Sequence, residues 1–181
     1  MKIIKQVVAA GIGIALFAAL TTAQIPVLVV PNTFLQPRMA VLAFLAAIFG
    51  PTVGGVIGLF GHALGDAIFE GGVWWSWVIP EIIVGVAIGL FAKKFAVEDG
   101  GFGFKNILLF NVVQILANAV AWIGLAPILD ILIYSEPKNK VFSQGAVAFV
   151  LNIIIIAILG TILLATYSKI AGGSKELKAE E

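Results

Sequence analysis

His62, Asp66 and Glu70 follow one another at intervals of four residues within the segment GLFGHALGDAIFEGG. In an α-helix this spacing keeps the three side chains near one face, because residues four apart lie one turn above each other. Imidazole and carboxylate groups arranged in this way can bind a polar ligand, pass a proton or hydrogen-bond one another. Ionisable groups in such apolar surroundings are costly unless they face a partner or a cavity. The stripe is therefore a candidate binding site, with a structural alternative in which His62 and Asp66 join helices and Glu70 is merely hydrated.

Aromatic residues follow this stripe directly. The segment VWWSWVIPE places Trp74, Trp75 and Trp77 shortly before Glu81. Indole rings can form the walls of a pocket for a flat ligand, although tryptophans also gather at membrane interfaces without any ligand. Glu81 enters the next helix at its outer end, so its carboxylate is expected at the same depth as the stripe. We predict that all four residues bind substrate, with an interfacial belt as the alternative for the tryptophans.

A second polar stripe lies further along the chain, at Asn111, Gln114, Asn118 and Trp122. Recurrence every three or four residues places these side chains on one face of a helix. Amides at that spacing can form hydrogen bonds between helices or bind a neutral polar ligand. Asn118 and Trp122 fall in the outer half of the membrane and are predicted to bind substrate, whereas the other two lie deeper and are predicted to be structural. Asp130 is expected near the outer surface.

The composition shows that these residues belong to a membrane protein. Of 181 residues, 61% are hydrophobic and 12% are charged, and the mean hydropathy is +1.10. A soluble domain of this length does not have such a composition. Apolar stretches of 18 or more residues can cross a hydrocarbon core of roughly 30 Å as helices. Hydropathy and helix-breaking residues predict an all-α integral membrane protein, a bundle of six transmembrane helices. The predicted spans are 3–23, 37–49, 51–69, 74–93, 105–133 and 143–169.

The charged residues predict the orientation of this bundle. With both termini in the cytoplasm, the inner segments contain lysines at positions 2, 5, 93, 94, 105, 169, 175 and 178, and the outer loops contain only Arg38, Lys138 and Lys140. This asymmetry fits the positive-inside rule. We predict a transmembrane substrate-binding domain at 1–169 and a cytoplasmic polar tail at 170–181. The first outer loop, TAQIPVLVVPNTFLQPR, is apolar and contains three prolines, so it is expected to pack over the mouth of the bundle.

The sequence also excludes several kinds of chemistry. It contains no cysteine and a single histidine. Disulfides, iron–sulfur clusters and cysteine-based zinc sites are therefore ruled out, and neither a metal nor another cofactor is expected. There is no Walker motif, HExxH or GxSxG, so we do not expect an enzyme, and the chain cannot hydrolyse ATP itself. Uphill transport would need an ion gradient or partner subunits.

Small residues recur at every fourth position of the first helix, at Gly11, Ala15 and Ala19. Small-xxx-small faces allow helices to approach closely in lipid. We predict that this face docks a partner.

Taken together, these features resemble a known family. The six spans, the small-residue first helix, the proline-marked outer loop and the segments FGPTVGGVIGLFGHALGD and VWWSWVIPEIIVGVAIGLF resemble the substrate-binding S component of energy-coupling-factor (ECF) vitamin transporters. The resemblance spans about residues 7–168. It is greatest to an uncharacterised group linked to hydroxymethylpyrimidine-like vitamin precursors.

The resemblance implies a prokaryotic plasma-membrane protein that binds its vitamin near the outer face. It also implies assembly with a transmembrane T component and two ATPase subunits, docked through an AxxxA motif that Ala15 and Ala19 match best. A hydroxymethylpyrimidine-, thiamine- or pyridoxine-like ligand would stack on a tryptophan. An aminopyrimidine edge would pair with a carboxylate such as Asp66 or Glu81.

Three other functions remain open on the sequence alone. A stand-alone secondary carrier would use His62 and Asp66 as a proton relay. An intramembrane enzyme would use His62 as a general base oriented by Asp66. A purely structural membrane subunit would use the same residues for stability alone.

Overall fold

The computed structural model describes residues 2–179, and their secondary structure is helical apart from one short hairpin. Four helices in this part of the chain are long and apolar enough to cross a membrane, and two shorter apolar helices accompany them. This confirms the predicted class, an all-helical membrane protein. The four long helices are Ile3–Ala23, Pro51–Glu70, Phe104–Tyr134 and Lys138–Ser174, and the shorter ones are Arg38–Phe49 and Trp75–Leu90.

Several of the long helices combine α-helical segments with a 3-10 or π-helical turn. The first joins α1 (Lys2–Ala19) to η1 (Leu20–Ala23). The elements that follow the hairpin are α2 (Arg38–Phe49), α3 (Pro51–Val56), η2 (Ile57–Gly61), α4 (His62–Gly65), η3 (Asp66–Glu70), α5 (Trp75–Leu90) and α6 (Ala92–Phe95). The C-terminal half contains α7 (Phe104–Asn118), η4 (Ala119–Leu125), α8 (Ala126–Tyr134), α9 (Lys138–Ile155), η5 (Ile156–Gly160) and α10 (Thr161–Ala179).

Glycine and proline set the helix boundaries near the predicted positions. Gly50 and Pro51 separate α2 from α3 with almost no loop. The helix that ends at Glu70 is followed by Gly71 in the left-handed region (φ +80°), where a residue without a Cβ is unstrained. The last helix begins at Lys138, directly after Pro137, and not at 143 as predicted. Hydropathy marks only the apolar part of a helix, so it missed the polar first turns.

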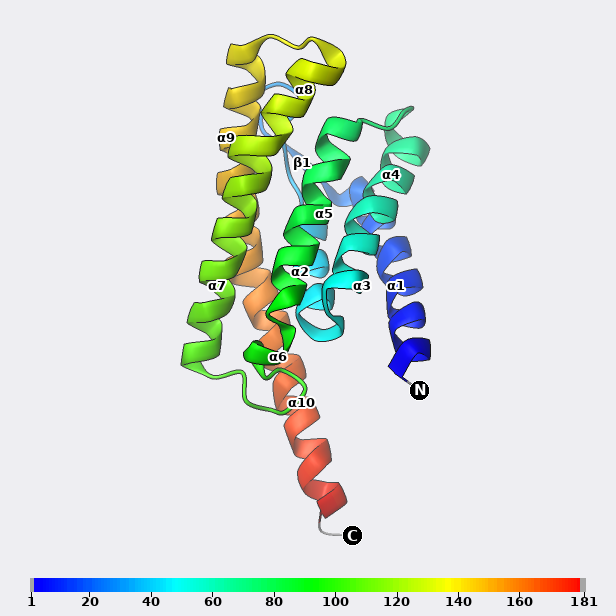
Figure 1. The fold of residues 1–181 in the computed structure, drawn as a ribbon, viewed down its shortest axis with the longest axis vertical. Coiled ribbons are helices and arrows are strands. Elements are labelled where there is room, and N and C mark those ends of the chain that lie inside the picture. The colour runs from blue at the N-terminus through cyan, green and yellow to red at the C-terminus, as the bar shows by residue number, and fades with distance from the viewer. Residues whose placement is uncertain (1, 180–181) are drawn as a thin grey trace.

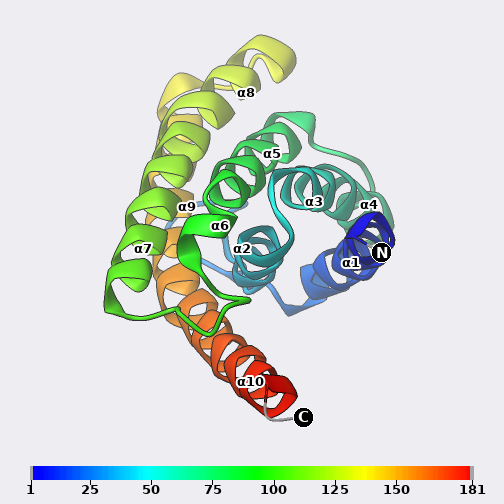
Figure 2. The ribbon, with the colours of Figure 1, turned by 60° about the horizontal axis from the view of Figure 1, so that its bottom comes forward.

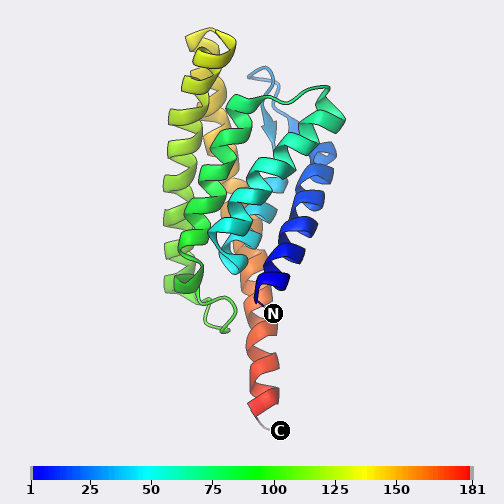
Figure 3. The same ribbon diagram turned by 45° about the vertical axis from the view of Figure 1, so that its right-hand side comes forward.

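The predicted tail, as far as Ala179, is part of this last helix, because α10 continues without a break from Thr161 to Ala179; the tail's last two residues lie outside the described part of the chain. Figures 1 and 3 show its end projecting beyond the other helices. At about 1.5 Å per residue, the 37 residues of Lys138–Ser174 extend roughly 55 Å, well beyond a hydrocarbon core of about 30 Å.

The short helix α2 lies inside the bundle. Figure 2 shows it between α1, α3 and α5 on one side and the α9–α10 rod on the other. Met39, Leu42 and Ala46 of this helix are fully buried, and they pack in one cluster with Phe17 and Ile57. Its twelve residues extend roughly 18 Å, so α2 is shorter than a hydrocarbon core of about 30 Å.

Glycines bring α3 and α5 into backbone contact. A Cβ at Gly54 would overlap the backbone of Gly85, and a Cβ at Gly85 would overlap that of Gly54. One turn further along, a Cβ at Gly58 would meet the carbonyl oxygen of Glu81 at 2.7 Å. Small residues therefore let the helix that carries Glu81 lie directly against the helix that carries His62.

The loop that was predicted to be the first outer loop forms a small hairpin over one end of the bundle. Strand β1 (Ile25–Pro26) pairs antiparallel with β2 (Phe34–Leu35). Figure 1 shows the hairpin at the end where α8 and α9 meet, away from both chain ends. The Gln144 side chain of α9 donates a hydrogen bond to the Pro31 carbonyl at 2.9 Å. The expected packing of this loop over the bundle mouth is confirmed.

Candidate functional site

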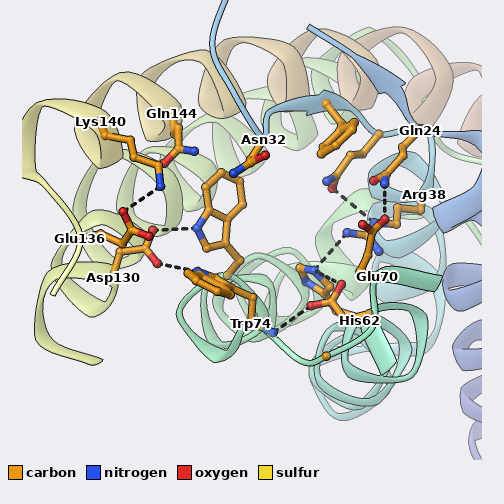
Figure 4. Close-up of a pocket in the computed structure, with 15 residues that line it drawn as sticks. Gln24, Asn32, Arg38, His62, Glu70, Trp74, Asp130, Glu136, Lys140 and Gln144 are labelled. Carbon is orange, nitrogen blue, oxygen red and sulfur yellow. Dashed lines mark hydrogen bonds and ion pairs between the residues drawn. The ribbon is translucent and has the colours of Figure 1, made fainter. Parts of the chain in front are cut away.

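A cavity of about 330 Å³ lies at the hairpin end of the bundle (Figure 4). The hairpin segment and the start of α2 form one wall, α4 and η3 form the second, the start of α5 forms the third, and α8 and α9 form the fourth. Most of the lining residues are polar, and the aromatic side chains Phe34, Trp74 and Trp77 are among the others. This combination suits a small ligand with both a flat face and hydrogen-bonding groups.

His62 is the centre of a buried ionic network beside the cavity. Its Nε2 atom lies 3.1 Å from Nη2 of Arg38 and 3.2 Å from Oδ1 of Asp66. Its Nδ1 atom lies 3.0 Å from Oε2 of Glu81, at ion-pair distance. The four side chains are buried together, and His62 lies between the two carboxylates while Arg38 contacts its Nε2 edge. The i, i+4 contact of His62 with Asp66 is the one that the sequence spacing indicated.

Two proton arrangements are open to this network. Nε2 of His62 can accept a hydrogen bond from Arg38 only when it carries no proton, and it can donate to Asp66 only when it does. The network can therefore hold a proton in more than one way.

Arg38 connects the network to the first outer loop. Its side chain is 1% exposed, donates from Nη1 to the Thr21 hydroxyl at 2.8 Å and from Nε to the Gln36 side-chain oxygen at 3.3 Å. Its guanidinium also lies over the Phe17 ring, 4.9 Å from the centroid. From the sequence, Arg38 is expected only as a charge in an outer loop. The available signal was an arginine at the start of a helix that is otherwise wholly apolar.

Asp130 of α8 organises the tryptophan segment at the start of α5. Its Oδ1 accepts hydrogen bonds from Nε1 of Trp74 at 2.7 Å and from the Ser76 hydroxyl, and its Oδ2 accepts one from Nε1 of Trp77 at 2.8 Å. Asp130 is 2% exposed and lines the cavity. It was placed near the outer surface from the sequence but was not selected as a site residue. A lone aspartate near a helix end carries no periodic signal.

The outer rim of the cavity contains two further polar pairs. Lys140 and Glu136, one turn apart, form an ion pair at 2.7 Å. Glu70 accepts a hydrogen bond from the Gln24 side chain at 2.6 Å. Figure 4 shows these pairs on opposite sides of the cavity. The other rim residues were missed, Gln24 because it lies in a largely apolar loop, and Glu136 and Lys140 because their segment has the composition of an ordinary polar turn.

The structure places five of the predicted site residues on the cavity wall. These are His62, Asp66, Glu70, Trp74 and Trp77. They come together because Gly71 ends η3 and the chain turns back into α5. The backbone N–H of Trp74 donates to Oδ2 of Asp66 at 3.1 Å, which fixes this turn.

The other four predicted residues do not line the cavity in this structure. Trp75 points outward and is 46% exposed. Glu81 is fully buried behind His62. Asn118 is buried and donates to the Gln114 carbonyl at 2.8 Å. Trp122 is buried against Trp77, with ring centroids 5.3 Å apart, so it is separated from the cavity by one aromatic layer.

The predicted docking stripe lies on the side of α1 that faces away from the bundle. Gly11, Ala15 and Ala19 are exposed, and a Cβ at Gly11 would meet nothing within 4 Å. Gly13 and Phe17, on the opposite face, are buried against the bundle. The stripe is therefore open to a partner from outside the chain.

Among the described residues, no group of three or more His, Cys, Asp or Glu side chains is placed to hold a metal ion. The network around His62 is built for hydrogen bonding and charge compensation.

The fold and the cavity define a class: a helical membrane protein with a cavity lined by polar and aromatic residues near one end of its bundle. Comparison with known proteins identifies the family. The chain belongs to the family of S components of ECF-type riboflavin transporters, whose model it matches over residues 1–169. This is a family of membrane transport proteins involved in vitamin uptake, not a family of enzymes.

Curated relatives cover nearly the whole chain. A UPF0397 protein of an Exiguobacterium species is 52% identical over 177 residues, covering 97% of this chain and 96% of the relative. UPF0397 proteins of Streptococcus pneumoniae strains are 48% identical over 165 residues, covering 91% of this chain and 90% of theirs. No solved structure matches the chain.

Proposed function

We propose that the chain is the substrate-specificity subunit of an ECF-type importer and that it binds a small heteroaromatic vitamin or vitamin precursor at the outer face. The ligand class is hydroxymethylpyrimidine- or thiamine-like, or pyridoxine-like. The observation that carries this proposal is the cavity at the hairpin end, which combines two indole walls with the Asp66 carboxylate and His62. A flat ring can stack on an indole while its polar edge bonds to the carboxylate.

The charges around the cavity favour a neutral or cationic ligand over an anionic one. Four carboxylates line it, from Asp66, Glu70, Asp130 and Glu136, against the two permanent cations Arg38 and Lys140. Arg38 is already bonded to His62, and Lys140 to Glu136, so neither cation is held ready for an anion. An anionic vitamin such as pantothenate would meet net repulsion.

Riboflavin is a competing ligand, because the family model bears its name. The cavity volume of about 330 Å³ is at the lower end of the range for small-molecule sites. A ligand with one or two rings fits that volume better than a tricyclic ring system with a polyol chain. A binding test must therefore include riboflavin as well as ligands with one or two rings.

The predicted inner layer contributes to the same site in this proposal. Glu81 supports His62 from behind, and Trp122 supports Trp77. Asn118 lies one turn before Trp122 on the same long helix and is buried with it. Trp75 serves as an interfacial residue on the outside of the bundle.

Energy for uptake is proposed to come from a transmembrane T component and two ATPase subunits, because the chain has no ATP-binding motif. The exposed stripe of Gly11, Ala15 and Ala19 is the proposed docking face, where a partner helix can approach the backbone closely. No cofactor is needed for this role.

The proposed topology has six crossings in a prokaryotic plasma membrane, with both termini cytoplasmic and the cavity outside. It is supported by the lysine distribution and by Figure 1, in which both chain ends lie at the end of the bundle away from the hairpin. On this topology, residues 1–169 form the transmembrane binding domain and 170–181 the cytoplasmic tail.

A proton-coupled carrier is the second candidate, favoured by the His62 network with its two proton arrangements. It predicts uptake into vesicles that contain this chain alone and are energised by a proton gradient. Uptake that needs the T component, the ATPase subunits and ATP would exclude it.

The proposal is tested by calorimetric titration of the detergent-purified chain with hydroxymethylpyrimidine, thiamine, pyridoxine, riboflavin and pantothenate. Submicromolar binding of one of the first three is expected. Trp74→Phe, on the cavity wall, should weaken that binding, and Trp75→Phe, on the outside, is the matched control. Binding of riboflavin or pantothenate alone would overturn the proposed ligand class, and a flat response to all five from folded protein would overturn the binding role.

A further inference from the structure

We infer that Asp130 is a positioning residue that holds the indoles of Trp74 and Trp77 in the orientation that a flat ligand needs. This inference rests on the proposed function for its ligand readout, but the positioning itself has a readout that requires no ligand.

The carboxylate of Asp130 accepts three hydrogen bonds, all from donors in one short segment. Oδ1 accepts from Trp74 Nε1 and from the Ser76 hydroxyl, and Oδ2 accepts from Trp77 Nε1. All three donors belong to the WWSW segment that begins α5, whereas the acceptor belongs to α8, more than fifty residues later. One side chain therefore fixes both indoles that line the cavity.

The partners of Asp130 are neutral, although the residue is 2% exposed. Burying a carboxylate in this way is costly unless its oxygens are hydrogen-bonded. The three bonds satisfy that requirement and use the oxygens that a ligand would otherwise contact. Asp130 therefore lines the cavity without being its main polar contact, a role that remains for Asp66 and Glu70.

Tyr134 reinforces the same arrangement one turn further along α8. Its ring stacks on Trp74, with centroids 4.1 Å apart and planes 22° apart. Its hydroxyl accepts a hydrogen bond from the backbone N–H of Trp75 at 3.0 Å. The face of α8 that carries Asp130 and Tyr134 thus clamps the start of α5. Figure 4 shows Asp130 and Trp74 on the same side of the cavity.

Indole orientation decides which ligand stacks. Aromatic rings prefer offset-stacked or edge-to-face arrangements. Indoles that rotate freely would therefore bind the ligand more weakly and discriminate less between ligands. Holding the wall before the ligand arrives also removes the entropy cost of ordering it during binding.

Asp130→Asn tests this inference with little change of shape. The amide keeps one acceptor oxygen for Trp74 and Ser76 but presents an NH₂ group to the Trp77 N–H, a donor against a donor. Loss of this charge-assisted bond is expected to weaken hydroxymethylpyrimidine or pyridoxine binding about tenfold or more. The control is Ser76→Ala, which removes a bond to the same carboxylate but leaves both indoles attached, and which should bind within about threefold of wild type.

A ligand-free readout accompanies the titration. Near-UV circular dichroism reports fixed aromatic packing. Asp130→Asn should lose tryptophan signal that Ser76→Ala keeps, with equal far-UV spectra. Trp77→Phe keeps an aromatic side chain but replaces the indole and so removes its bond to Oδ2, which tests the same contact if Asp130→Asn does not fold. In the double variant Asp130→Asn/Trp77→Phe the two affinity losses should not add.

The outcomes separate the two proposals. If wild type binds none of the five compounds, the proposed function fails and the circular dichroism comparison alone decides the positioning role. If wild type binds and Asp130→Asn keeps both its affinity and its tryptophan signal, the inference is overturned and the proposed function stands. Additive losses in the double variant would also overturn it.

Discussion

The Nδ1 atom of His62 lies 3.0 Å from Oε2 of Glu81, and both side chains are buried beside the cavity. On the other edge of the imidazole, Nε2 lies 3.2 Å from Oδ1 of Asp66, which does line the cavity. The two carboxylates thus hold one imidazole from opposite sides, but only one of them is accessible to a ligand. This difference separates their expected roles.

Asp66→Asn should weaken ligand binding more than it lowers stability, and Glu81→Gln should do the reverse. Asp66 faces the cavity, so its charge is available to a ligand edge. Glu81 is fully buried, so removing its charge leaves His62 without its inner partner. Titration calorimetry and thermal unfolding of each variant in the same detergent measure the two effects. Equal affinity losses in both variants would contradict this separation.

Arg38→Met should lower the free energy of unfolding by about 1–3 kcal/mol, because it leaves buried hydrogen-bond partners without their donor. The side chain is 1% exposed and contacts His62, Thr21 and Gln36. Lys140→Met is the control, because its ion pair with Glu136 lies on the partly exposed rim and is worth about 1 kcal/mol or less. Denaturant unfolding followed by fluorescence compares the two. Similar losses in both variants would refute the assignment of Arg38 to a buried network.

Helical periodicity made much of this site predictable. It identified the face that carries His62, Asp66 and Glu70, because those contacts lie within one helix. Asn118 and Trp122, which were predicted to bind substrate, are buried but do not line the cavity. Their distance from the cavity could not be predicted, since periodicity gives the face of a helix and not the side chain that packs against it.

Arg38 and Asp130 show most clearly which contacts could not be predicted from the sequence. Each contacts residues on other helices, at separations of 24 residues for Arg38 and His62 and 53 for Asp130 and Trp77. Contacts of that kind depend on how the helices pack, which local pattern does not specify. Breaker residues and hydropathy were sufficient for the boundaries of most helices, but not for the polar first turns of α9 (Lys138–Ile155).

Gly54→Ala should destabilise the fold by roughly 1–3 kcal/mol or more, the cost of overpacking a close contact. A Cβ there would overlap the backbone of Gly85, which cannot move aside as a flexible side chain can. Gly124→Ala is the matched control, because a Cβ there meets nothing within 4 Å and alanine favours helix by about 1 kcal/mol. Thermal unfolding of both variants gives the comparison. A stable Gly54→Ala variant would show that α3 and α5 are not in backbone contact.

Ala15→Trp should prevent assembly with the T component and the ATPase subunits without changing vitamin binding. Ala15 is exposed on the stripe formed with Gly11 and Ala19, where a large ring would hold a partner helix away. Leu116→Trp is the control, because Leu116 is 63% exposed on α7, at a different surface of the bundle. Co-purification with the coexpressed subunits and vitamin uptake by cells measure assembly, and calorimetry on the isolated chain measures binding. If Ala15→Trp assembles and transports normally while Leu116→Trp does not, the docking face lies on α7 and not on α1.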